Sequence, residues 1–64
     1  SAERRRRLTD AIAAGVDDGQ FPARVDAEAA SVALSGAVFY RRLMTADALD
    51  ADFVIDLIDT VLGE

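Results

Sequence analysis

The hydrophobic positions along the chain recur at helical spacing in three segments, which two short breaks separate. Within each segment the apolar residues lie three and four positions apart, as on one face of a helix with 3.6 residues per turn. No stretch of useful length alternates between apolar and polar residues, so strands are not expected. The pattern predicts an all-α fold with three helices at about residues 2–18, 27–45 and 51–62.

The ends of the predicted helices carry local signals. Gly19, followed by Phe21 and Pro22, ends the first helix, because glycine suits a left-handed cap and proline cannot continue a helix. Asp26 and Asp50 precede the second and third helices, where a carboxylate can accept hydrogen bonds from the first backbone N–H groups. These signals support the boundaries that the periodicity predicts.

The second predicted helix is apolar on two sides. Its polar strip is narrow, and a helix of this kind has to be covered on both sides. Two other short helices in the same chain cannot easily do that. One apolar face holds Ala29, Val32, Ala33, Gly36, Phe39, Tyr40 and Leu43. The other face holds Ala30, Leu34, Ala37, Val38 and Met44, with Arg41 among them.

The third predicted helix has a wide apolar arc opposite a strip of aspartates at positions 52, 56 and 59. Together, the second and third helices present more apolar surface than a chain of 64 residues can hide, which is typical of an association surface. We therefore expect these two helices to form half of an intermolecular four-helix bundle.

Two side chains of the second helix invite a specific role. Arg41 points toward an otherwise apolar face, where it either extends its charged end to solvent or pairs with an acidic residue of a neighbouring helix or chain; we favour the ion pair. Tyr40 lies beside Phe39, and we expect it to be buried with its hydroxyl reaching a partner rather than to be catalytic.

The composition leaves little catalytic chemistry. Cysteine and histidine are both absent, which removes thiolate nucleophiles, imidazole bases and the usual zinc and haem ligands. The three aspartates of the third helix are explained more simply as a solvent-facing strip than as a site for a divalent cation. We expect no enzyme, no catalytic residue, no cofactor and no metal.

The charge is distributed unevenly. The net charge is −5, although Arg4 to Arg7 make the start of the chain basic. Such an acidic chain is a poor nucleic-acid binder as a whole, and the arginine run is expected to be solvated rather than a nucleic-acid or lipid contact. Four arginines also oppose the dipole at a helix N-terminus, which indicates a helix that begins upstream in a longer parent. Neither a signal peptide nor a membrane span is expected, and the expected location is cytoplasmic.

The residues from Ser35 to Thr45, followed by residues 48–50 and 53–54, resemble the end of the C-terminal domain of tetracycline-repressor-like (TetR family) transcription regulators. In many of these a Gly-x-x-x-Tyr-Arg-x-Leu segment precedes a short turn and a final amphipathic helix. Residues 19–26 also look like the loop that leads into the penultimate helix. The resemblance covers roughly residues 8–63.

The resemblance implies a regulator, for example a repressor, with an N-terminal helix-turn-helix and a helical effector-binding domain whose last two long helices pair across a two-fold axis. Residues 1–64 would be a C-terminal fragment of that effector-binding and dimerisation domain, forming a homodimer. DNA binding would belong to the missing N-terminal domain, and any small-molecule effector to the parent. The alternative is a stand-alone helical module that binds another protein. The implied dimer interface comprises Val32, Gly36, Phe39, Tyr40, Leu43, Leu57, Ile58 and Val61.

Overall fold

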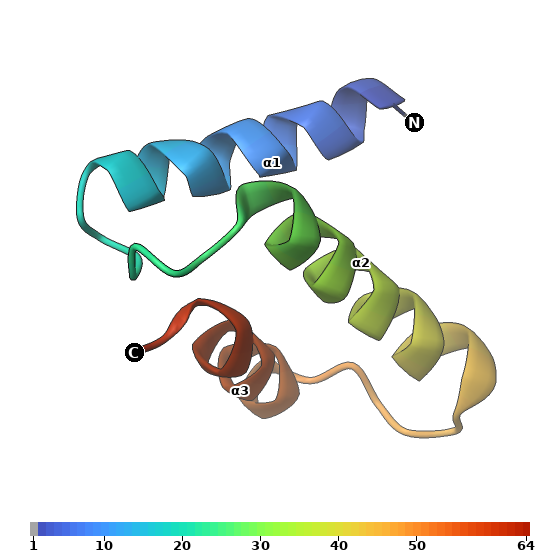
Figure 1. Cartoon of the computed structure of the whole chain (residues 1–64). Helices are drawn as coiled ribbons and strands as arrows, with labels where there is room; N and C mark the ends of the chain where they lie inside the picture. The colour runs from blue at the N-terminus through green and yellow to red at the C-terminus, as the bar shows by residue number, and fades with distance from the viewer. Residues whose placement is uncertain (1) are drawn as a thin grey trace.

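The computed structural model describes residues 2–64, which form three α-helices and no strand (Figure 1). Helix α1 spans Ala2–Asp17, α2 spans Ala27–Met44 and α3 spans Ala51–Leu62. The predicted all-α fold is confirmed. Figure 1 shows α1 lying across the first half of α2, with α3 packed beside α2 after a loop.

Helices α1 and α2 each end one residue before the expected position. Gly19 has a φ of 81°, the left-handed conformation expected of a glycine cap, and its N–H donates to the Val16 carbonyl three residues back. Thr45 is already extended, and its hydroxyl donates to the Arg41 carbonyl at 2.7 Å. In both places a local hydrogen bond accompanies the end of the helix, one residue earlier than expected.

The turn after α1 folds back onto its own helix. The N–H groups of Gln20 and Phe21 both donate to the Gly15 carbonyl, at 2.9 and 3.1 Å. This brings the Phe21 ring so close to the buried Gly15 that a Cβ at that position would overlap the ring. Gly15 therefore permits a close approach that no larger residue allows in this geometry.

Aspartates cap the other two helices as predicted. The Asp26 carboxylate accepts a hydrogen bond from the Ala29 N–H at 2.8 Å, and the Asp50 carboxylate accepts one from the Phe53 N–H at 2.9 Å. The loop before α2 is also tied to the far end of the chain, because the Arg24 guanidinium donates to the Gly63 carbonyl just beyond α3. This bond places a positive charge at the end of α3 where the helix dipole is negative.

The buried core is small and lies at one end of the molecule. Its members come from α1, the loop before α2, the first turns of α2 and the end of α3, and none is large and fully enclosed. They are Ile12, Val25, Ala30 and Leu62.

The arrangement of the three helices is open. The radius of gyration is 12.2 Å, whereas a compact domain of this length has one of about 10.7 Å. The described chain therefore has a broad surface that its own helices do not cover.

Candidate interaction surface

The structure assigns different surroundings to the two apolar faces of α2. One face is turned inward, where Ala30 and its neighbour Ser31 are buried and Leu34, Ala37 and Val38 are half-buried. The other face is largely exposed. The sequence pattern left open which face belongs to the core, and the structure answers that question.

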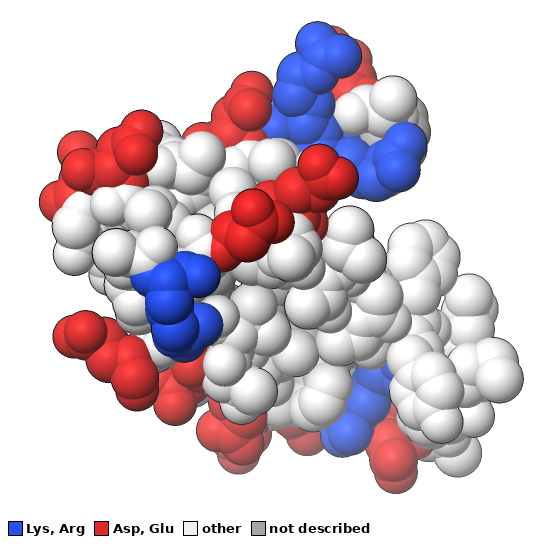
Figure 2. Space-filling model, in the orientation of Figure 1, with Lys and Arg blue, Asp and Glu red and all other residues white. Residues whose placement is uncertain are grey.

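The uncovered face of α2, which we call the open face, carries a continuous line of apolar residues. Val32, Phe39 and Leu43 are 62%, 65% and 71% exposed. Gly36 lies among them, and a Cβ built on it would meet nothing within 4 Å. Figure 2 shows a large uncharged area over the C-terminal half of α2, whereas charged side chains gather around α1. This area is the strongest candidate for a functional surface.

Tyr40 is exposed in the single chain. We expected a buried ring, but the side chain is 63% exposed on the open face. Tyr40 lies at the rim of the line formed by Val32, Gly36, Phe39 and Leu43, where no element of this chain lies opposite. Tyr40 is therefore not packed within the single chain, and its place in an interface stays a prediction.

Helix α3 adds to this surface only in part. Ile58 is exposed, Leu57 is half-buried, and Val61 packs against the small core. Ile55 is as exposed as the residues of the open face, and it was not among the predicted interface residues. Its position three residues before Ile58 places both on one side of α3, and that spacing could have identified it.

A shallow apolar groove lies between the exposed parts of α2 and α3. It has a volume of about 370 Å³. Its floor and walls come from all three helices, and its lining is almost entirely apolar. The lining residues are Leu8, Leu34, Ser35, Val38, Phe39, Val54, Leu57 and Ile58. The groove connects the Phe39 end of the open face with Ile58, so three of the predicted interface residues meet there.

Arg41 takes neither of the roles expected for it within the chain. Its Nε donates to the Ala48 carbonyl at 2.9 Å, and its guanidinium lies 4.0 Å from the centre of the Phe53 ring. The predicted ion pair with an acidic residue is absent among residues 2–64. The guanidinium instead donates a hydrogen bond to the loop and makes a cation–π contact with the Phe53 ring. Arg41 thereby holds the loop and α3 against α2.

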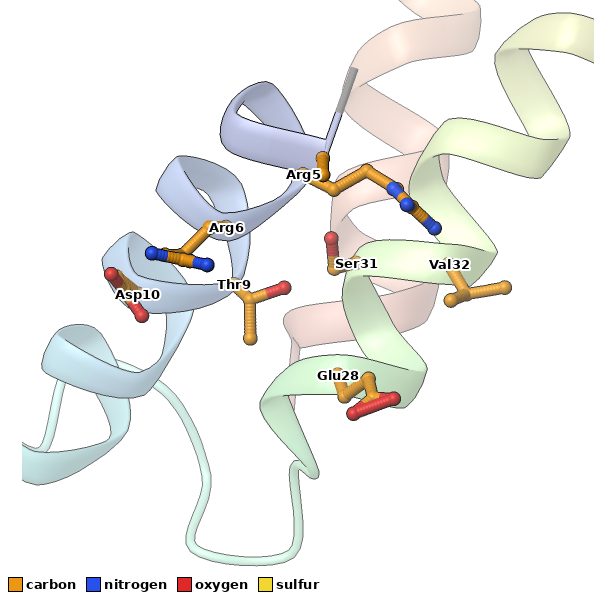
Figure 3. A pocket seen from close by; sticks show the side chains of 8 residues that line it. Arg5, Arg6, Thr9, Asp10, Glu28, Ser31 and Val32 are labelled. Carbon is orange, nitrogen blue, oxygen red and sulfur yellow. The ribbon is translucent and has the colours of Figure 1, made fainter.

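A second, polar hollow of about 220 Å³ lies between the first turns of α1 and α2 (Figure 3). Arg5 reaches from α1 toward α2, and Glu28 and Val32 line the hollow from α2. Arg7, two residues further along α1, is exposed and pairs with Glu3 at 3.8 Å, an arrangement that adds little stability in water. Thr9 and Ser31 contribute hydroxyl groups to the hollow, but no histidine or cysteine accompanies them because the chain contains neither.

The described residues contain neither a metal-binding cluster nor a membrane-spanning helix. No group of three or more acidic residues is placed to hold a metal ion within residues 2–64. None of the helices α1 to α3 has the length and apolar character needed to cross a membrane.

The described chain is an all-α domain with one long, exposed apolar face. Comparison with protein families identifies its class: the family model "Tetracyclin repressor-like, C-terminal domain" matches residues 1–61. The chain belongs to this family, the effector-binding and dimerisation region of transcription regulators that act as dimers and bind DNA and effectors. This region is a regulatory rather than an enzymatic domain. Searches among curated proteins and among solved structures found no match.

Proposed function

We propose that this chain is the dimerisation portion of a tetracycline-repressor-like transcription regulator. In this proposal α2 and α3 pack against α2 and α3 of a second copy as a four-helix bundle. DNA contact is made by a separate helix-turn-helix part of the regulator, and the bundle holds two such parts at a fixed spacing. The observation that carries the proposal is the exposed line of Val32, Phe39 and Leu43 along α2.

The extent of the uncovered surface fits a second copy. The accessible surface is 4874 Å², whereas a compact monomer of this mass exposes about 3,950 Å². The excess of roughly 900 Å² is close to the ~800 Å² that each partner buries in a stable protein–protein interface. Covering this surface with a second copy would also bury the apolar side chains that the small core leaves exposed.

The predicted interface residues divide into two groups in this proposal. Val32, Phe39, Tyr40 and Leu43 are the contact residues, with the two aromatic rings as the main anchors because large rings contribute most to interface energies. Gly36 lets the second helix approach the backbone closely. Of the α3 residues, Ile58 lies at the edge of the contact, whereas Leu57 and Val61 support it from the inside.

The test is sedimentation velocity of the chain over a hundredfold dilution, with helicity followed by circular dichroism. We expect a species of twice the chain mass that loses helicity as it dissociates, because the small core leaves the single chain marginally stable. A helical monomer at every concentration would overturn the proposal. A complex formed only with another protein would favour the stand-alone interaction module.

The variant Gly36→Arg places a long charged side chain at the centre of the open face and should abolish the dimer. Ala11→Arg is the matched control, because Ala11 is exposed on α1, away from this face. The control should dimerise like the unmodified chain. If both variants dimerise equally, Gly36 is not in the interface.

A further inference from the structure

Opposite charges stand at the two ends of the open face of α2. Glu28 lies in the first turn of the helix and Arg42 in the last turn, and both are exposed. They are two heptads apart, with Ser35 midway between them. Because seven residues make nearly two full turns, the three positions fall on almost one line along the helix surface.

These charges border the apolar line rather than lying behind it. Figure 3 shows Glu28 and Val32 extending to the same side of α2. Arg42 lines a surface hollow together with Phe39 and Leu43. Within residues 2–64 neither Glu28 nor Arg42 makes an ion pair or a side-chain hydrogen bond. The two charges are therefore available to a partner that covers the open face.

The apolar residues are arranged about nearly the same centre as the charges. Val32 and Phe39 are equally far from the midpoint between Ser35 and Gly36, and Glu28 and Arg42 are equally far from Ser35, half a residue away. A half-turn about an axis through Ser35, perpendicular to α2, brings Glu28 of each copy level with Arg42 of the other. The same rotation brings Val32 of each copy within one residue of Phe39 of the other. Such mutual pairing is the property of a two-fold interface.

We propose that α2 pairs antiparallel with α2 of a second copy, crossing near Gly36, and that two reciprocal Glu28–Arg42 ion pairs fix this register and select the partner. The inference rests on the proposed function, since it specifies how the dimer forms. The two ion pairs would lie about 21 Å apart, at either end of the seam, given a rise of 1.5 Å per residue. A parallel pairing would instead place Glu28 beside Glu28 and Arg42 beside Arg42, where like charges repel.

The experiment uses two charge-reversal variants of the full chain, Glu28→Arg and Arg42→Glu. Each alone places two like-charged pairs in its own dimer, and we expect its dissociation constant to rise by about tenfold or more at low salt. Each reversal also opposes the dipole of α2, so a weaker dimer of one variant does not by itself establish the ion pairs. The mixture of the two variants separates these causes.

In a mixed dimer both pairs are again of opposite charge, while the helix-dipole cost of each variant remains. Native mass spectrometry of an equal mixture at low salt should therefore show mostly mixed dimers, and the preference should shrink at high salt. The doubly reversed chain should pair with itself and exclude the unmodified chain.

Random mixing of the two variants, from an unmodified chain that is itself dimeric, would overturn the register while leaving the proposed function intact. An unmodified chain that stays monomeric would overturn both. Circular dichroism of each variant at high concentration checks that the chains are helical.

Discussion

The junction between α1 and α2 and the C-terminal half of α2 contain similar apolar residues in opposite surroundings. At the junction Ile12 and Ala30 are buried, and the Phe21 ring lies on Gly15. Along the C-terminal half of α2, Phe39 and Leu43 are exposed. Apolar character alone therefore does not locate the core of a short helical chain. An apolar residue is buried only where another element of the same chain packs against it.

The difference follows from the lengths and positions of the elements. Helix α1 and the loop before α2 both reach the first turns of α2, so that end is covered from two sides. Helix α3 has 12 residues against 18 in α2 and packs along the inward face only. The remaining face of α2 is exposed. Substitutions at matched residues in the two regions test this explanation for the difference in burial.

The largest effect is expected from shortening a side chain of the core. Ile12→Ala should lower the free energy of unfolding by about 2–5 kcal/mol, because the side chain is 3% exposed and leaves a cavity. Leu43→Ala removes almost no contact within the chain, so its effect should be confined to weaker dimerisation. Urea unfolding and sedimentation of both variants provide the measurement. An equal loss of helicity at every urea concentration would contradict the difference between the regions.

A smaller and opposite pair of effects is expected at two glycines. Gly15→Ala forces the Phe21 ring to move and should cost about 1–3 kcal/mol, which lowers the melting temperature by several degrees. In Gly36→Ala the new Cβ meets open space. The variant should therefore stabilise the helical form of the dissociated chain by about 0.5–1 kcal/mol, because alanine has the higher helix propensity. Thermal melts followed by circular dichroism compare the two. Stabilisation by Gly15→Ala would show that the turn after α1 is loosely held.

The smallest effect is expected at the contact that holds α3. Arg41→Lys keeps the charge but loses the planar group that bonds the Ala48 carbonyl and stacks on Phe53, at a cost of about 1 kcal/mol. Arg6→Lys is the control, because Arg6 is exposed on α1 and makes no such contact within residues 2–64. Urea unfolding of the two variants at one chain concentration makes the comparison. Equal stability of both would mean that the Arg41 contact contributes nothing measurable.

Local sequence signals were sufficient for the helices and their caps. The three- and four-residue spacing identified all three helices, and Asp26 and Asp50 cap α2 and α3 as expected. Each of these features depends on residues a few positions apart. That is why a single sequence, without any knowledge of the tertiary structure, could reveal them.

Features that depend on distant residues could not be predicted in the same way. The two faces of α2 are almost equally apolar, so only the positions of α1 and α3 decide which one is buried. The partner of Arg41 is a backbone carbonyl in the following loop, and no residue type at position 48 signals that bond. The contact of Arg24 with the Gly63 carbonyl joins two segments that the periodicity treats as unrelated.

The packing of each helix on the next one in sequence also has a consequence for the speed of assembly. Helices that follow one another in sequence and also pack on one another form within microseconds to milliseconds, because little chain has to be closed before contacts form. The slow step in making an active regulator would then be the encounter of two chains. The rate of this step is proportional to the square of the chain concentration. Newly made copies that have not met a partner would open often and be degraded by proteases in proportion to their unfolded population. The amount of working regulator would thus respond more steeply than linearly to the rate of synthesis.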